Sequence, residues 1–115
     1  MTLRWQSVVV DCRDPARVGW FWSQVLGLPL HREEPELWIE PEGDSPVILF
    51  VEVPEAKTVK NRLHIDLRPD DQRAEVERLE SLGARRVDIG QGEVPWVVMA
   101  DPEGNESCVL KPLPA

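Results

Sequence analysis

The sequence predicts an α+β fold made of two consecutive βαβββ modules, each with one main helix packed on a mixed sheet. A strand, a helix and a closing glycine occur in the same order twice, with the glycines at Gly27 and Gly83. Further strand-like segments follow each glycine, and the turn sequences PEGD (41–44) and PEGN (102–105) precede the last strand of each half. Roughly eight strands with only two helices favour an α+β protein over a doubly wound one.

The first module is predicted over about residues 3–53. Its first strand, SVVVDCRD (7–14), is rich in β-branched residues and leads to Asp14-Pro15, a helix N-cap followed by proline at the first helical position. Strands are then predicted around 28–31, 37–40 and 47–53, and the register of the last is left open by one residue. The helix itself has one apolar face, formed by Val18, Phe21, Trp22, Val25 and Leu26.

A linker over 54–60 leads to the second module, predicted over about 61–112, and we expect one domain over 1–115. The strand LHIDLRP (63–69) precedes a helix capped by Asp70 or Asp71, and three strands follow around 85–89, 96–100 and 106–110. Two alternating sets of side chains are expected on the first strand. The set facing the helix is Leu63, Ile65 and Leu67, and the set on the other face is Arg62, His64, Asp66 and Arg68. The helix is expected to bury Val76, Leu79 and Leu82.

Composition excludes several classes of partner. The 115 residues are 42% hydrophobic and 30% charged, which is ordinary for a protein with a buried core. The net charge of −8 argues against nucleic acid and anionic membranes, because both require basic patches. No apolar run reaches the length of a membrane span. The two cysteines have no CxxC spacing, and the N-terminus has no signal-like apolar region, so a reduced cytoplasmic protein is expected.

Three segments carry a family resemblance: SVVVDCRDPARVGWFWSQVLGLPL (7–30), KNRLHIDLRPDDQRAEVERLESLGA (60–84) and WVVMADPEGNESCVL (96–110). The chain resembles the vicinal oxygen chelate superfamily, and within it the small glyoxalase-like domains. The resemblance implies paired βαβββ modules whose curved sheets form a cup, often completed by a second subunit, so a homodimer is expected. Members include glyoxalase-type isomerases, epimerases, ring-cleaving dioxygenases, thiol transferases and metal-free proteins that sequester drugs, so the fold alone does not identify the reaction.

The resemblance also implies where a metal would bind. Metal-dependent members carry ligands on the first and last strands of each module, and His64 occupies one of these positions. The corresponding position of the first module holds Ser7, and Cys108 replaces the glutamate expected on the final strand. Val51 occupies the fourth position, unless a slipped register brings Glu52 there.

These residues form a poor version of the family's metal site. His64, Ser7 and Cys108 cannot supply two histidines and a carboxylate for non-haem iron. His64 and Cys108 could hold zinc only with further carboxylate or water ligands, to which Glu106 could contribute. No cofactor is therefore favoured. A divalent metal, with His64 as ligand, is the alternative.

His64 has two further interpretations. A histidine can exchange protons near neutral pH, so His64 could be a base, with Asp66 or Glu106 assisting it. It could equally be a hydrogen-bonded residue of the sheet with no chemical role. Cys108 could be a nucleophile if a nearby cation activates it, although a buried apolar role is commoner for a lone strand cysteine.

Two functions follow, from different classes. The favoured one is a small-molecule-binding protein that sequesters a planar or cationic compound in its cup. Its expected ligand-binding residues are Ser7, Trp38, His64, Asp66, Trp96 and Cys108. Trp38 and Trp96 stand at similar places in the two modules, where they either stack on a ligand or belong to the core. The alternative is a glyoxalase- or epimerase-type lyase or isomerase, in which His64, with Glu106, abstracts a proton next to a carbonyl.

Overall fold

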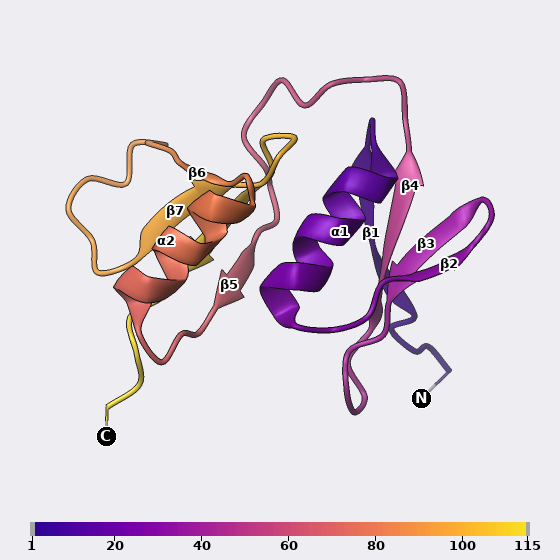
Figure 1. Ribbon diagram of the computed structural model, residues 1–115, viewed down its shortest axis with the longest axis horizontal. Coiled ribbons are helices and arrows are strands. Elements are labelled where there is room, and N and C mark those ends of the chain that lie inside the picture. The colour runs from indigo at the N-terminus through magenta and orange to yellow at the C-terminus, as the bar shows by residue number, and fades with distance from the viewer. Residues whose placement is uncertain (1, 115) are drawn as a thin grey trace. The chain divides into compact units, whose positions relative to one another are not determined.

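A computed structural model describes residues 2–114 and confirms the repeated βαβββ plan (Figure 1). The chain divides into two compact units, and the division between Ala56 and Lys57 falls in the segment 54–60. Module 1 contains β1 (Ser7–Cys12), α1 (Pro15–Leu26), β2 (His31–Glu33), β3 (Glu36–Ile39) and β4 (Val47–Glu52). Module 2 contains β5 (Ile65–Leu67), α2 (Gln72–Leu82), β6 (Arg85–Arg86), β7 (Val97–Ala100) and β8 (Glu106–Val109).

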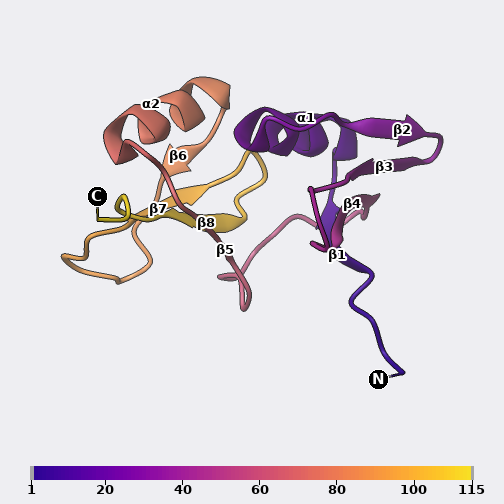
Figure 2. The same ribbon diagram turned by 90° about the horizontal axis from the view of Figure 1, so that it is seen from below.

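Both modules have the same sheet topology. The strand orders are β1-β4-β3-β2 and β5-β8-β7-β6, so the first strand of each module pairs with the last. That pair is parallel, and the remaining pairs are antiparallel. Each helix lies on one face of its own sheet (Figure 2), so the other face of each sheet is not covered by that helix.

The ends of both helices follow from local sequence. Asp14 accepts a hydrogen bond from the backbone N–H of Arg17 at 3.2 Å, with Pro15 as the first helical residue. In module 2 the cap is Asp71 rather than Asp70, and its Oδ1 accepts from the N–H of Ala74 at 3.1 Å. Gly27 and Gly83 end the helices in left-handed conformations, at φ 66° and 115°. These backbone angles favour glycine, as the sequence predicts.

The core of each module lies between its helix and its sheet. In module 1 the buried helix residues include Phe21 and Trp22, as predicted, and Ile39 and Phe50 of the sheet are buried with them. In module 2, Val76 and Leu79 of α2 are buried, as are Met99 of β7 and Val109 of β8. The predicted helix faces are therefore confirmed at their centres, while Val25, Leu26 and Leu82 are only half-buried.

Three strand predictions require correction. The predicted strand around 28–31 starts only at His31, because the N–H of Leu28 bonds to Ser23 O at 3.1 Å as part of the helix cap. β5 is shorter than 63–69, and Leu63 is 88% exposed rather than buried. The segment before β5 is irregular, and the N–H of Asn61 bonds to the Glu106 carboxylate rather than to a strand. The strand predicted over 85–89 contains only Arg85–Arg86.

The register of β4 is now defined. Val51 is the partner of Asp11 on β1, while Phe50 is buried on the helix side. Alternation therefore places Val51 on the face away from α1, and no slipped register brings Glu52 there. Within residues 2–114, no helix is long and apolar enough to cross a membrane.

Candidate functional site

Module 2 contains a pocket of about 360 Å³ on the sheet face opposite α2. Five of the residues predicted to form the site line it: His64, Asp66, Trp96, Glu106 and Cys108. Ile89, Val98 and Leu110 add apolar surface, and Lys60, Asn61 and Gln91 add polar groups. The pocket is thus formed by the edge of β5, by β7 and β8, and by the irregular segments before β5 and β7.

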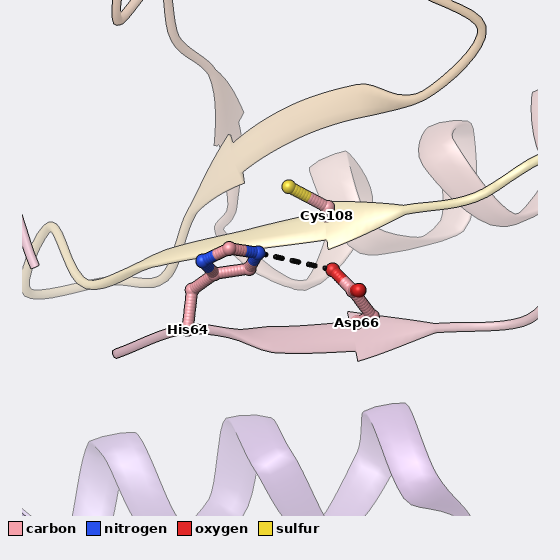
Figure 3. A group of neighbouring side chains, drawn as sticks. All are labelled: His64, Asp66 and Cys108. Atoms are coloured by element: carbon pink, nitrogen blue, oxygen red, sulfur yellow. Dashed lines mark ion pairs between the residues drawn. The ribbon is translucent and has the colours of Figure 1, made fainter. Parts of the chain in front are cut away.

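Strand register brings the reactive side chains of the pocket together. Asp66 and Cys108 are direct partners in the parallel β5–β8 pair. His64 lies two residues before Asp66 and projects from the same side of the chain (Figure 3). Its Nε2 lies 3.1 Å from Asp66 Oδ1. One donor atom from each of His64, Asp66 and Cys108 lies within 4.8 Å of the other two.

The Cys108 thiol is buried, whereas the His64 and Asp66 side chains are 45% and 53% exposed. Burial raises the pKa of Cys108 above its ordinary value, and the negative charge of Asp66 raises it further, while Lys60 opposes the shift. Cys108 is therefore a neutral thiol at neutral pH. This state is a poor nucleophile, because the thiolate is the reactive form.

Glu106 lines the same pocket, but its carboxylate already contacts two other groups of module 2. Its Oε2 lies 2.8 Å from Lys57 Nζ, and its carboxylate accepts the N–H of Asn61 at 3.2 Å. Burial would raise the pKa of Glu106, but the Lys57 ammonium and the backbone amides of Glu106 and Asn61 outweigh it, so the pKa is lowered. Glu106 therefore remains ionised at neutral pH and attaches the segment before β5 to the sheet.

Trp96 contributes an accessible aromatic ring to the pocket. It is 39% exposed and immediately precedes β7. The neighbouring Pro95 carbonyl accepts a hydrogen bond from Gln72 Nε2 at 2.8 Å, and the same amide nitrogen reaches Val109 O at 3.1 Å. The first residue of α2 thus positions the chain that carries the indole.

The other two predicted ligand-binding residues lie in module 1, and neither lines the module 2 pocket. Ser7 begins β1 opposite Val47. Trp38 stacks on His31, with ring centroids 5.5 Å apart, and its Nε1 donates to Glu40 at 3.0 Å. A separate depression in module 1, near Arg13 and Arg32, contains neither residue.

The donor groups present differ from those of the family's metal site. In module 1 the implied ligand positions hold the Ser7 hydroxyl and the Val51 side chain, which has no donor atom. Module 2 retains His64 and Cys108, and Asp66 adds a third donor beside them. The sequence predicts Asp66 as a partner of His64 and as a residue that binds a small molecule, but not as a metal ligand, although the two-residue spacing places both side chains on one face.

Some pocket residues were not predicted to belong to the site. Ile89 and Gln91 lie between β6 and β7, and Ile89 was predicted at the end of a strand that stops at Arg86 in the structure. Their position depends on local turns, including the 2.8 Å hydrogen bond from the N–H of Ile89 to Gln91 Oε1. Lys57 does not line the pocket itself but lies in the segment predicted as a linker, and its pairing with Glu106 depends on the folded chain.

Comparisons with known proteins agree with this architecture. The family model described as glyoxalase-like domain matches residues 7–110. A glyoxalase/bleomycin resistance protein/dioxygenase family enzyme from Burkholderia phytofirmans PsJN is 18% identical, with a TM-score of 0.74 over 96% of this chain and 100% of that one. No curated protein sequence gives a significant match.

Two further solved structures have different functions. An antibiotic-binding protein from Streptomyces sp. CB03234 is 23% identical, with a TM-score of 0.67 over 98% of this chain and 99% of that one. The trypanothione-dependent glyoxalase I of Leishmania major is 14% identical, with a TM-score of 0.66 over 96% of this chain and 87% of that one. At these identities the similarity shows the fold and leaves the activity open.

Proposed function

The chain belongs to the glyoxalase-like domain family of the vicinal oxygen chelate superfamily, and from its module 2 pocket we propose that it is a small-molecule-binding protein. The observation that carries the proposal is a pocket of about 360 Å³ that combines an accessible indole with a few polar groups. Ligand sites typically have this composition, with apolar walls for affinity and sparse polar groups for orientation.

The chemistry of the pocket favours a planar or cationic compound. Trp96 offers a ring face for stacking or for a cation–π contact. Asp66 is the half-exposed carboxylate of the wall, whereas the Glu106 charge is already neutralised by Lys57. The antibiotic-binding protein of the Streptomyces species supports the same class of function on this fold.

Intrinsic fluorescence tests this proposal, because Trp96 lies in the pocket wall. A panel of planar cationic compounds is expected to include one that quenches the wild-type protein below millimolar concentration. Trp96→Phe should lose most of that change. The matched control is Trp20→Phe, which removes an exposed tryptophan on α1, 48% accessible, and should retain it. Absence of quenching across the panel would contradict the proposal.

The geometry of His64 favours a second candidate, a lyase or isomerase that abstracts a proton next to a carbonyl. The 3.1 Å contact with Asp66 orients the imidazole through Nε2, and a neutral ring that donates from Nε2 keeps the Nδ1 lone pair as a base. The trypanothione-dependent glyoxalase I of Leishmania major, an enzyme with this fold, supports an enzymatic candidate.

This second candidate predicts that replacing His64 lowers kcat strongly, whereas replacing His31 does not change it. If turnover of a small α-oxo compound or its thiol adduct is found, His64→Ala should lower kcat at least about a hundredfold. His31→Ala, which removes the only other histidine of the chain, should leave kcat unchanged. Equal activity of wild-type protein and His64→Ala would exclude His64 as the base.

The remaining parts of the proposal rest on the family rather than on the pocket. We propose that residues 1–115 form one domain, that Ser7 and Trp38 contribute to ligand binding, and that the protein acts as a cytoplasmic homodimer. Glu106 takes a positioning role in this proposal, because its carboxylate is held by Lys57 and Asn61.

A further inference from the structure

We propose that His64, Asp66 and Cys108 bind one zinc-class divalent ion in a site contained entirely within module 2. Two of these ligands, His64 and Cys108, stand at positions that the family resemblance implies, whereas Asp66 does not. The two remaining family positions hold Ser7 and Val51 in module 1 and take no part in the proposed site. The inference does not rest on the proposed function, because ion binding can be measured without an organic ligand.

The first support is the spacing of the three donor atoms. In a tetrahedral zinc site, bonds of about 2.0–2.3 Å place neighbouring donor atoms about 3.3–3.8 Å apart. His64 Nε2 and Asp66 Oδ1 are 3.1 Å apart, and the three donors all lie within 4.8 Å of one another. Small side-chain rotations are therefore enough to place one ion in contact with all three.

The second support is that the backbone already holds the donors in position. Asp66 and Cys108 are partners in the parallel β5–β8 pair, and His64 is two residues from Asp66 on the same face (Figure 3). Cys108 is buried on a central strand of the sheet. Two of the three ligands therefore need no loop closure to meet, which lowers the entropic cost of forming the site.

The chemical nature of the donors selects the class of ion. One imidazole nitrogen, one carboxylate oxygen and one sulfur suit zinc, which accepts nitrogen, oxygen and sulfur ligands. Magnesium and calcium require oxygen ligands, and the set lacks the second histidine typical of non-haem iron sites. Three protein ligands would leave a position for water or a ligand atom, where a bound zinc ion would act as a Lewis acid.

The contacts of the two pocket carboxylates also indicate that Asp66, and not Glu106, is the carboxylate ligand of this site. Glu106, which the sequence predicts as a possible additional metal ligand, lies 2.8 Å from Lys57 Nζ and accepts the N–H of Asn61. If Glu106 bound the ion, the partly buried ammonium group of Lys57 would lose its counter-ion. Asp66 is less buried, with a side chain that is 53% exposed, and its carboxylate contacts His64, another donor of the proposed site.

The test uses tag-free, chelator-treated protein titrated with zinc against a chromophoric indicator, and with cobalt as a spectroscopic substitute. We expect one ion per chain and a thiolate-to-cobalt charge-transfer band in the near ultraviolet. Cys108→Ser should abolish the band, and His64→Ala or Asp66→Asn should weaken zinc binding by at least about tenfold. The sequence provides matched controls, because Cys12 and His31 are the only other cysteine and histidine. Cys12→Ser and His31→Ala should bind as the wild type does.

A measurement on the wild-type chain covers the case in which Cys108→Ser fails to fold. Zinc should slow alkylation of Cys108 by iodoacetamide and leave Cys12 unaffected, as read by peptide mass spectrometry. The proposal is overturned if zinc does not bind below millimolar concentration, if the cobalt band survives in Cys108→Ser, or if Cys108 is not protected. Fluorescence quenching that persists in chelator-treated protein would support the ligand pocket independently of this result.

Discussion

Replacing Asp101 with alanine is expected to lower the free energy of unfolding by about 3 kcal/mol, because two backbone donors would lose their buried acceptor. Asp101 is 1% exposed, in the DPEGN loop between β7 and β8. Its Oδ1 accepts the N–H of Glu103 at 2.9 Å and that of Asn105 at 3.0 Å. Its other oxygen accepts from the Asn105 side chain at 3.3 Å. The loop leads directly into β8, so loss of the Asp101 hydrogen bonds should also disturb the position of the pocket residues on that strand.

Asp88→Ala is the matched control for this prediction. Asp88 makes the same kind of turn contact, with Oδ1 accepting the N–H of Gly90 at 2.8 Å, but it is exposed to solvent. Water can replace its carboxylate, so we expect a loss below about 1 kcal/mol. Urea denaturation followed by circular dichroism measures both values. Equal losses in the two variants would show that burial of the Asp101 turn does not determine its contribution.

Replacing Lys57 with alanine is expected to lower stability at neutral pH by about 2–3 kcal/mol, somewhat less than for a fully buried ion pair. The side chains of Lys57 and Glu106 are 21% and 8% exposed, and their charged atoms are 2.8 Å apart. Removal of Lys57 leaves the Glu106 carboxylate buried without its counter-ion. Burial then raises the pKa of Glu106, which in the wild type is held below its ordinary value.

The effect of Lys57→Ala should depend on pH with a defined sign. A carboxylate whose pKa is lowered on folding stabilises the protein above its unfolded pKa, about 4.5, and this contribution is lost as pH falls through the lower folded pKa. The stability difference between wild type and variant should therefore be largest near pH 7 and shrink on acidification. Lys60→Ala is the control, because Lys60 is exposed, bonds the Asn61 carbonyl and is not the counter-ion of Glu106. A difference that stays constant down to pH 3 would contradict this account.

Much of the fold could be predicted from local sequence. The Asp14-Pro15 helix start, the closing glycines and the apolar faces of both helices depend on residues a few positions apart. The repeat of the same signals in both halves predicted two modules of one plan, and the order of the strands within each sheet came from the structure. Boundaries that depend on partners elsewhere were less predictable, and Leu63 is exposed because the chain before β5 bonds to Glu106 instead of continuing the strand.

The candidate site likewise has features that local sequence predicts and features that depend on distant residues. Alternation along one strand placed His64 and Asp66 on a common face, because side chains of a strand alternate with a period of two. The register between β5 and β8 places Cys108 beside them. Because Lys57 forms an ion pair with the buried Glu106, Asp66 is the exposed carboxylate of the pocket. Neither result can be obtained from amino-acid order alone, since each depends on which distant residues face one another after folding. The repeated modules are local in origin, whereas the composition of the pocket is a consequence of long-range pairing and burial.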